Sequence, residues 1–343
     1  MIFYDAPVIP DDLTTFVRDV PINPNLNLLN TFPVRFLDSN TIDWAEVVRT
    51  NRTAKFRSFD GRISVSKRDG GSDKRVSLLP LSDSLSQGEY ETLQLLFAQT
   101  GGTNAAALER AIYNDAENLT RNIQNRLELA WGDVLTDGIL TINENGFQGE
   151  ADFGVPGGNK VTAGTAWTNI AAPALADLRT WHDAYRAANG GAPGQTRMSQ
   201  RILRLLQANT GIVNAVYGAA AGRTWVNRSD LNALFESEGF APINVPDVAQ
   251  VDVDGTLVSV VPDDRLFLLP ENLSDLGYTA FGISATALEL VNSTEAELTF
   301  EEASGIVGVV LKDGPPFRQN TFVDCVAMPV LVDGRRLLVA DVA

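Results

Sequence analysis

One apolar stripe, within residues 103–136, constrains the fold more than any other feature of the sequence. Its members follow one another at steps of three or four residues, which places them on one face of a helix. They are Leu108, Ile112, Ala116, Leu119, Ile123, Leu127, Ala130 and Val134. A helix over this range would be roughly 50 Å long at 1.5 Å per residue, against an average of about 11–12 residues in globular proteins. We therefore expect a spine along which other elements pack.

The remaining chain combines shorter helices and strands, so the predicted fold class is α+β. Ser86 and Glu89 have the spacing of a capping box and predict a helix over 86–98. Apolar spacing and glycine stop signals predict further helices. Residues 139–165 and the last forty residues alternate like strands. The predicted helices are 173–188, 199–208 and 229–238, and the predicted strands include 251–261, 305–312, 321–331 and 335–342.

The basic residues concentrate in one segment, residues 51–80. It holds eight basic and three acidic residues, a local charge of +5, which leaves −21 for the other residues of this −16 chain. Alternating apolar residues and the turn sequence Asp69-Gly70-Gly71 predict a polar β-hairpin. Such a hairpin has little reason to lie on its own core, so we expect it to project and contact an acidic neighbouring subunit. The candidate inter-subunit residues are Arg57, Arg62, Lys67, Arg68, Lys74 and Arg75.

Residues 1–50 precede this hairpin and are rich in proline, asparagine and aspartate. No helical or strand period persists there, which predicts an extended arm. Such an arm becomes ordered only by lying along another surface.

The overall composition excludes several classes of protein. A net charge of −16 disfavours a protein that binds nucleic acid through a basic surface. Cys325 is the one cysteine, so an intrachain disulfide is excluded and a reducing compartment is expected. The start of the chain lacks the features of a signal peptide, and its apolar runs are too short for a membrane span. We expect a soluble intracellular protein with no membrane association.

One catalytic motif requires a test. Asp252-Val253-Asp254-Gly255-Thr256-Leu257 matches the DxDGT signature of haloacid-dehalogenase-type phosphatases, whose two aspartates reach a metal from the end of a parallel strand. Here the flanking residues alternate as in a hairpin with Asp-Gly at its turn. The only lysine downstream, Lys312, lies in a Lys-Asp-Gly turn sequence, and Asp263-Asp264 follows too closely to be the distant acidic pair that the chemistry also needs.

The other candidate chemistry is equally weak. His182 has no nearby serine or cysteine partner and is expected to be a packed or surface residue, and Cys325 a small buried one. Glycine-rich phosphate loops and calcium-binding loops are absent from the sequence. With one histidine and one cysteine, a zinc site of these residues is nearly excluded. We expect no enzymatic activity, no cofactor and no metal.

The order of arm, basic hairpin, spine helix, compact lobe and final strands resembles the major capsid proteins of tailed double-stranded DNA bacteriophages. More narrowly it resembles the lambda-type family with the Hong Kong 97-type fold. The resemblance covers nearly the whole chain. The segments that carry it are Thr41–Phe56, Leu266–Pro270, Leu276–Gly282 and Val326–Ala343.

The resemblance implies a role for each part. Residues 1–50 would be the N-terminal arm and 51–80 the extended loop over the adjacent subunit. Residues 81–165 and 301–343 would form the peripheral domain. Residues 166–300 would form the axial domain around fivefold and sixfold axes.

The resemblance also implies the partners. The chain would form hexamers and pentamers of an icosahedral shell around double-stranded DNA, without sequence-specific binding. Only 50 residues precede the loop, which implies a separate scaffolding protein, and a portal and a decoration protein are further expected partners. Lys67 and Lys74 are available for the loop crosslinks of some relatives, but no acceptor site is evident. The location would be the virion, assembled in the host cytoplasm.

Two alternatives stay open beside the phage shell. One is an encapsulin-type compartment that uses the same fold. The other, remote, is a phosphatase that uses Asp252 and Asp254.

Overall fold

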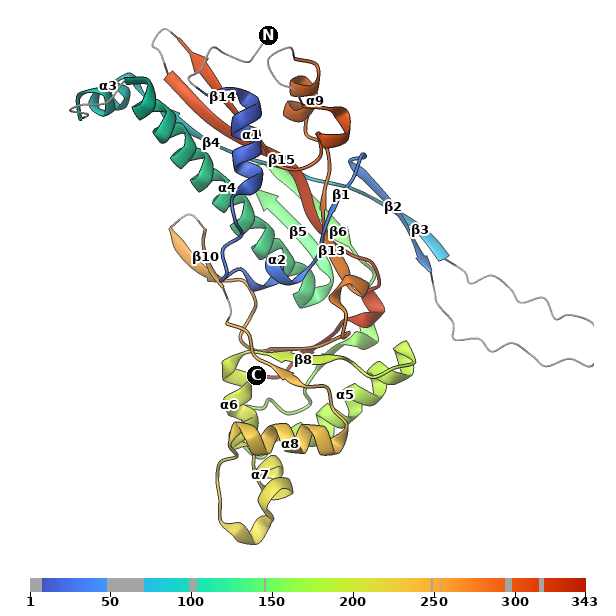
Figure 1. The fold of residues 1–343 in the computed structure, drawn as a ribbon. Helices are drawn as coiled ribbons and strands as arrows, with labels where there is room; N and C mark the ends of the chain where they lie inside the picture. The colour runs from blue at the N-terminus through green and yellow to red at the C-terminus, as the bar shows by residue number, and fades with distance from the viewer. Residues whose placement is uncertain are drawn as a thin grey trace, which may run out of the picture.

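The computed structural model describes residues 8–47, 71–98, 104–144, 146–247, 249–253, 255–293, 298–314 and 318–343. The molecule is elongated (Figure 1), and the two largest of the three hydrophobic clusters among its described residues lie in different parts of it. We call the part built on the long helix the upper body and the part that contains residues 160–245 the lower lobe.

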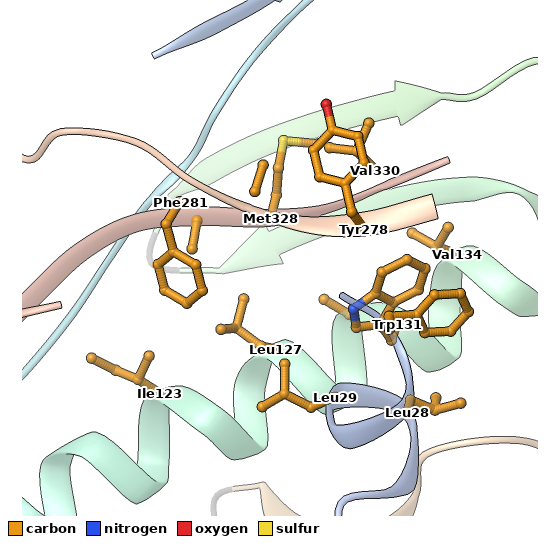
Figure 2. Packing of buried hydrophobic residues seen from close by; sticks show 14 of the residues in the cluster. Leu28, Leu29, Ile123, Leu127, Trp131, Val134, Tyr278, Phe281, Met328 and Val330 are labelled. Carbon is orange, nitrogen blue, oxygen red and sulfur yellow. The ribbon is translucent and has the colours of Figure 1, made fainter. Parts of the chain in front are cut away.

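The spine helix is confirmed. Helix α4 runs from Asn104 to Asp137, and every member of the predicted apolar stripe except the half-buried Leu108 is buried. Gly138 follows the helix with φ = 76°, a left-handed conformation that glycine adopts without strain. Figure 2 shows Ile123, Leu127 and Trp131 of α4 facing the buried side chains of the sheet above.

That sheet is mixed, and its strand order is β1-β13-β15-β14, with β4 paired to the first half of β15. Strand β1 is parallel to β13, and the other pairs are antiparallel. The strands are β1 (Val34–Phe36), β4 (Pro80–Gln87), β13 (Gly277–Phe281), β14 (Val307–Asp313) and β15 (Arg318–Leu331). The predicted strands at 305–312 and 321–331 are therefore confirmed.

The extended arm predicted for residues 1–50 is wrong for its described part. Helix α1 (Pro10–Asp19) begins with proline at its first turn and buries Leu13 and Val17. It packs on β14, where a Cβ on Gly308 would lie 3.1 Å from Leu13 Cγ. A short helix, α2 (Asn27–Thr31), then packs on α4. The short apolar runs of α1 and α2 pack on parts of the same chain that are distant in sequence. These contacts give the arm its helical structure.

The described part of the predicted hairpin pairs with residues that precede it. Strand β3 (Gly71–Ser77) pairs antiparallel with β2 (Thr41–Val47), which lies ahead of the predicted segment 51–80. Gly71, placed in a turn by the sequence, lies within β3. The antiparallel ribbon therefore starts about ten residues earlier than predicted.

The helix predicted to start at Ser86 also starts later. Ser86 lies in β4 opposite Asn320, and helix α3 runs from Glu89 to Ala98. Pairing with β15 holds Ser86 in the strand, and the Gly88 N–H donates to Glu91 Oε2 at 3.2 Å just before α3 begins.

The lower lobe packs helices on a second mixed sheet with the order β7-β16-β12-β8-β9. The predicted helices are confirmed, with Gly190 and Gly239 left-handed after α5 and α8; α7 was not predicted. The strands are β7 (Lys160–Thr162), β8 (Gln195–Met198), β9 (Ile243–Asn244), β12 (Arg265–Leu269) and β16 (Leu338–Asp341). The helices are α5 (Ala174–Asn189), α6 (Gln200–Ala208), α7 (Thr210–Tyr217) and α8 (Arg228–Glu238).

Hairpins and short turns complete the described chain. Strands β5 (Ile139–Glu144) and β6 (Phe147–Asp152) pair beside α4, and β10 (Gln250–Val253) pairs with β11 (Thr256–Ser259). Helix α9 (Ala285–Val291) packs near β14. The 3-10 turns are Gly157–Asn159, Ala219–Ala221, Leu273–Asp275, Phe300–Glu302 and Gly334–Arg336.

The sheets do not follow the predicted boundary at residue 300. Strand β13 and helix α9, placed with the compact lobe by the sequence, belong to the upper body. Strand β16, placed with the final upper strands, joins the lower sheet between β7 and β12. The position of these elements in the sequence does not predict their assignment, because the chain crosses between the upper body and the lower lobe more than once.

Candidate functional site

The six predicted inter-subunit residues are only partly within the described structure. Lys74 and Arg75 lie in β3, where their Cα partners are Trp44 and Asp43 of β2. The structure thus places Lys74 and Arg75 on one ribbon. That the other four lie near them stays a prediction. Four lie outside the described residues: Arg57, Arg62, Lys67 and Arg68.

Asn40 fixes the base of this ribbon, immediately before β2. Its Nδ2 donates to the Ile283 carbonyl at 2.7 Å, and its Oδ1 accepts from the Ile283 N–H at 2.8 Å. Its own carbonyl accepts from the Leu78 N–H at 2.8 Å, just after β3. One residue therefore ties both strands of the ribbon to the end of β13. A Cβ on Gly282 would lie 2.5 Å from Asn40 Oδ1, so glycine is needed there.

Apolar burial at the base complements this clamp. Ile42 and Leu78 are buried in the upper core, while the ribbon beyond them leaves the upper body (Figure 1). The sequence predicted a basic projecting hairpin but did not single out Asn40, because an asparagine in a proline-rich stretch is an ordinary loop residue.

A second ordered projection occurs at the tip of the lower lobe. Residues 219–225 are exposed, and Trp225 retains 48% of its surface. The Arg223 guanidinium lies 4.2 Å from the centre of the Tyr217 ring, and the Tyr217 hydroxyl donates to Asp230. The loop is held by its own contacts despite its exposure. The even spacing of the tryptophans in the sequence did not distinguish Trp225 from the buried Trp131 and Trp167.

The phosphatase motif lies in a setting that does not suit its chemistry. Asp252 is exposed in β10, which pairs antiparallel with β11 through a turn in which Gly255 has φ = 82°. Asp254 lies outside the described residues. The reaction needs the end of a parallel strand, so the hairpin interpretation is the correct one. Across the described ranges, no cluster of three or more histidine, cysteine, aspartate or glutamate residues could hold a metal ion.

The single histidine and cysteine are packed residues, as predicted. His182 is buried in α5: its Nδ1 lies 2.8 Å from the Leu178 carbonyl, and its Nε2 accepts from the Ala241 N–H at 3.3 Å. Cys325 is a buried free thiol in β15, and burial raises its pKa, which makes it inert as a nucleophile. In the part of the chain that the structure covers, no helix is long and apolar enough to cross a membrane.

The family model for phage major capsid protein E matches residues 11–299. This range covers most of the chain. The chain belongs to the phage major capsid protein E family. The sequence finds no significant match among curated proteins.

Solved structures show the same fold. A protein of a prophage in Escherichia coli CFT073, assigned as a capsid protein, has a TM-score of 0.64 at 15% identity, with 98% of this chain and 99% of that chain covered. A phage-related protein from Bordetella bronchiseptica RB50 has a TM-score of 0.55 at 14% identity, with 98% of each chain covered. At these identities the likeness establishes the fold and not a shared activity.

The expected family and fold are thus confirmed. This phage capsid protein is a structural shell protein of the virion with the Hong Kong 97-type fold, and its shell is built from many copies. An encapsulin-type compartment is not better supported, because the matching family model is that of a phage protein.

Proposed function

We propose that this capsid protein assembles into hexamers and pentamers of an icosahedral shell, and that the β2–β3 ribbon with residues 51–70 contacts the adjacent subunit. The observation that carries the proposal is the base of the ribbon: Asn40 binds the Ile283 backbone while the strands leave the upper body. A ribbon fixed at its base and leaving its own core is suited to reach another copy. Its six candidate contact residues are Arg57, Arg62, Lys67, Arg68, Lys74 and Arg75.

In this proposal the two parts of the molecule have separate roles. The upper body serves as the peripheral domain, and the lower lobe, with the Trp225 loop at its tip, serves as the axial domain around the fivefold and sixfold axes. The sheet topology supports assigning β13 and α9 to the peripheral domain and β16 to the axial domain.

The charge distribution supports the proposed partners. A −21 remainder suits a wall that encloses double-stranded DNA without adhering to it, because phosphate repels acidic surfaces. We further propose a separate scaffolding protein, a portal and a decoration protein as partners, assembly in the host cytoplasm, and no enzymatic activity.

The test is charge reversal in the loop. Arg68→Glu with Arg75→Glu would lower the charge of residues 51–80 from +5 to +1 and so remove most of the attraction to an acidic neighbour. The yield of particles in electron micrographs should then fall at least about tenfold. Subunit folding should change by no more than about 1 kcal/mol, the cost of the like-charge pair that Arg75→Glu forms with Asp43 across the ribbon. The matched control, Arg68→Lys with Arg75→Lys, keeps both charges and should still assemble. A normal particle yield for the reversed variant would contradict the role of the loop.

A further inference from the structure

An apolar groove of about 380 Å³ opens on the upper body, between the end of α1, strand β1 and helix α4. Val34 and Phe36 of β1 line it and keep 40% and 64% of their surfaces exposed. Figure 2 shows the Phe281 ring, also in the lining, pointing toward α4, with Leu127 of α4 and Leu29 of α2 facing it. Large exposed apolar side chains beside such a groove mark a surface that binds another segment.

The walls of the groove are fixed by contacts within the described chain. Leu29 is held by α4, where the Glu128 carboxylate accepts from the Leu28 N–H at 2.9 Å and from the Leu29 N–H at 2.6 Å. The Phe36 and Phe281 rings lie with their centres 5.8 Å apart. The groove is therefore already formed, and an occupant need not open it.

Gln124 of α4 also lines the groove and has an unused hydrogen-bond acceptor. It is 5% exposed, and its Nε2 donates to the Val20 carbonyl at 3.4 Å. Within the described ranges, no group donates to its buried Oε1. Buried acceptors without a donor are rare and unfavourable. Since the last torsion of a glutamine side chain is soft, a small turn presents Oε1 to a donor in the groove.

Two charged residues, Arg18 and Glu302, complete the lining. The Arg18 guanidinium donates to the carbonyls of Ile306 at 3.0 Å and Glu302 at 2.8 Å. No ion pair between described residues includes Arg18. The Glu302 carboxylate already accepts from the Thr299 hydroxyl at 2.9 Å. An apolar occupant with a carboxylate therefore suits the groove better than the basic residues 51–70 do.

Residues 1–7, which precede the described chain, meet these requirements. They contain the run Met1-Ile2-Phe3-Tyr4 and one charged side chain, Asp5. They join Val8, which is buried in the upper core just before α1. Helix α1 is about 15 Å long, and Val17 near its other end lines the groove. Seven extended residues span up to about 25 Å, so the apolar run can reach the groove.

We propose that the run Ile2-Phe3-Tyr4 docks in this groove of its own chain and covers Val34 and Phe36. Its side chains bury the apolar lining, and an N–H or O–H group of the run donates to Gln124 Oε1. The short tether gives the run an effective concentration of about millimolar, which favours the same chain over a second copy. Docking thus covers, in the unassembled subunit, an apolar surface through which copies would otherwise associate.

Disulfide formation in the unassembled full chain tests the docking. Tyr4→Cys is combined with Phe36→Cys in the groove or, as a matched control, with Leu288→Cys on α9, which packs beside β14 as α1 does. Both partner positions are exposed, and the native Cys325 is buried. A disulfide needs Cα atoms within about 7 Å, so the groove pair should close within one chain at least about tenfold faster than the control pair.

Substitutions identify the docking contacts. In the groove pair, Phe3→Asp should slow disulfide formation at least about tenfold, because docking would then bury a charge in an apolar surface. Val34→Asp, at an exposed position of the groove, should slow it in the same way. The control Ala6→Asp adds the same charge outside the apolar run and should change the rate by no more than about twofold.

Three outcomes would overturn the proposal. Equal rates for the groove and control pairs would exclude docking in the groove, and disulfides formed mainly between chains would exclude the same chain as its source. A rate that neither Phe3→Asp nor Val34→Asp lowers would exclude the apolar contacts. The measurement uses single subunits, so its result is independent of whether pentamers and hexamers form.

Discussion

The geometry around His182 fixes its protonation state in the folded protein. Its Nε2 accepts the Ala241 N–H, its Nδ1 faces the Leu178 carbonyl, and its ring stacks 4.5 Å from Phe240. This pattern requires the neutral ring with the proton on Nδ1. A second proton on Nε2 would point at an N–H and remove a buried hydrogen bond. Burial, the largest cause, lowers the pKa of His182 below 6.5.

Protonation of His182 should therefore lower the free energy of unfolding in acid. A lowered pKa in the folded state gives stability that is present above pH 6.5 and lost as the pH falls through the folded value. His182→Asn, which keeps a donor near Nδ1 but does not titrate there, should lower stability at pH 7.5 and flatten its decline toward pH 5. Urea midpoints of both proteins at the two pH values measure this. Equal declines in the two proteins would contradict the assignment.

At the scale of elements, the packing of another segment against α4 explains a glycine inside this helix. Gly132 lies inside the helix, where alanine would ordinarily be better by about 0.5–1 kcal/mol. A Cβ at this position would lie 1.9 Å from the Val260 carbonyl oxygen and 2.7 Å from its Cγ1. The segment that links the lower lobe to the β10–β11 hairpin thus packs directly on the spine.

Gly132→Ala should accordingly destabilise the protein, against the helix propensity of alanine. We expect a loss of about 1–3 kcal/mol, the range for overpacking, measured as a lower free energy of unfolding in urea. The control Gly157→Ala has open space around the new Cβ and should change stability by less than about 1 kcal/mol. An increase in stability for Gly132→Ala would contradict the close approach.

The elements differ in how far local pattern determines them. The stripe of α4 and the glycine stops after α5 and α8 are local signals, and these helices are confirmed within one residue or so. Helix α1 has a stripe of only three buried apolar residues, Pro10, Leu13 and Val17, in a proline-rich context. This helix depends on packing against β14 for its stability. Its sequence alone therefore has too weak a helical pattern and is interpreted as an extended arm.

At the scale of the whole molecule, the charge is divided between a basic loop and an acidic remainder. Residues 51–80 carry +5 against −21 elsewhere. In the proposed assembly, the basic loop of one subunit attracts the acidic surface of the next through charge. This attraction is therefore screened by salt, since the Debye length falls from about 10 Å at 0.1 M to about 3 Å at 1 M.

Assembly should therefore weaken as salt increases. We expect the particle yield, followed by light scattering, to fall between 50 mM and 0.5 M sodium chloride, while the circular dichroism of the subunits stays constant. The Arg68→Glu, Arg75→Glu variant should show less of this dependence, because the charge of residues 51–80 falls from +5 to +1. A yield that rises steadily with salt would indicate that apolar contacts drive assembly instead.

By itself the sequence determined the spine helix, the helices of the lower lobe, the hairpin form of the Asp252 motif and the basic segment, because each is encoded by neighbours in the chain. Tertiary structure decided the rest. The pairing of β2 with β3, the Asn40 clamp on Ile283, the placement of β16 and the capping of α2 by Glu128 join residues up to hundreds of positions apart. Periodicity is read over a few residues, whereas these contacts depend on which distant surfaces the folded chain brings together.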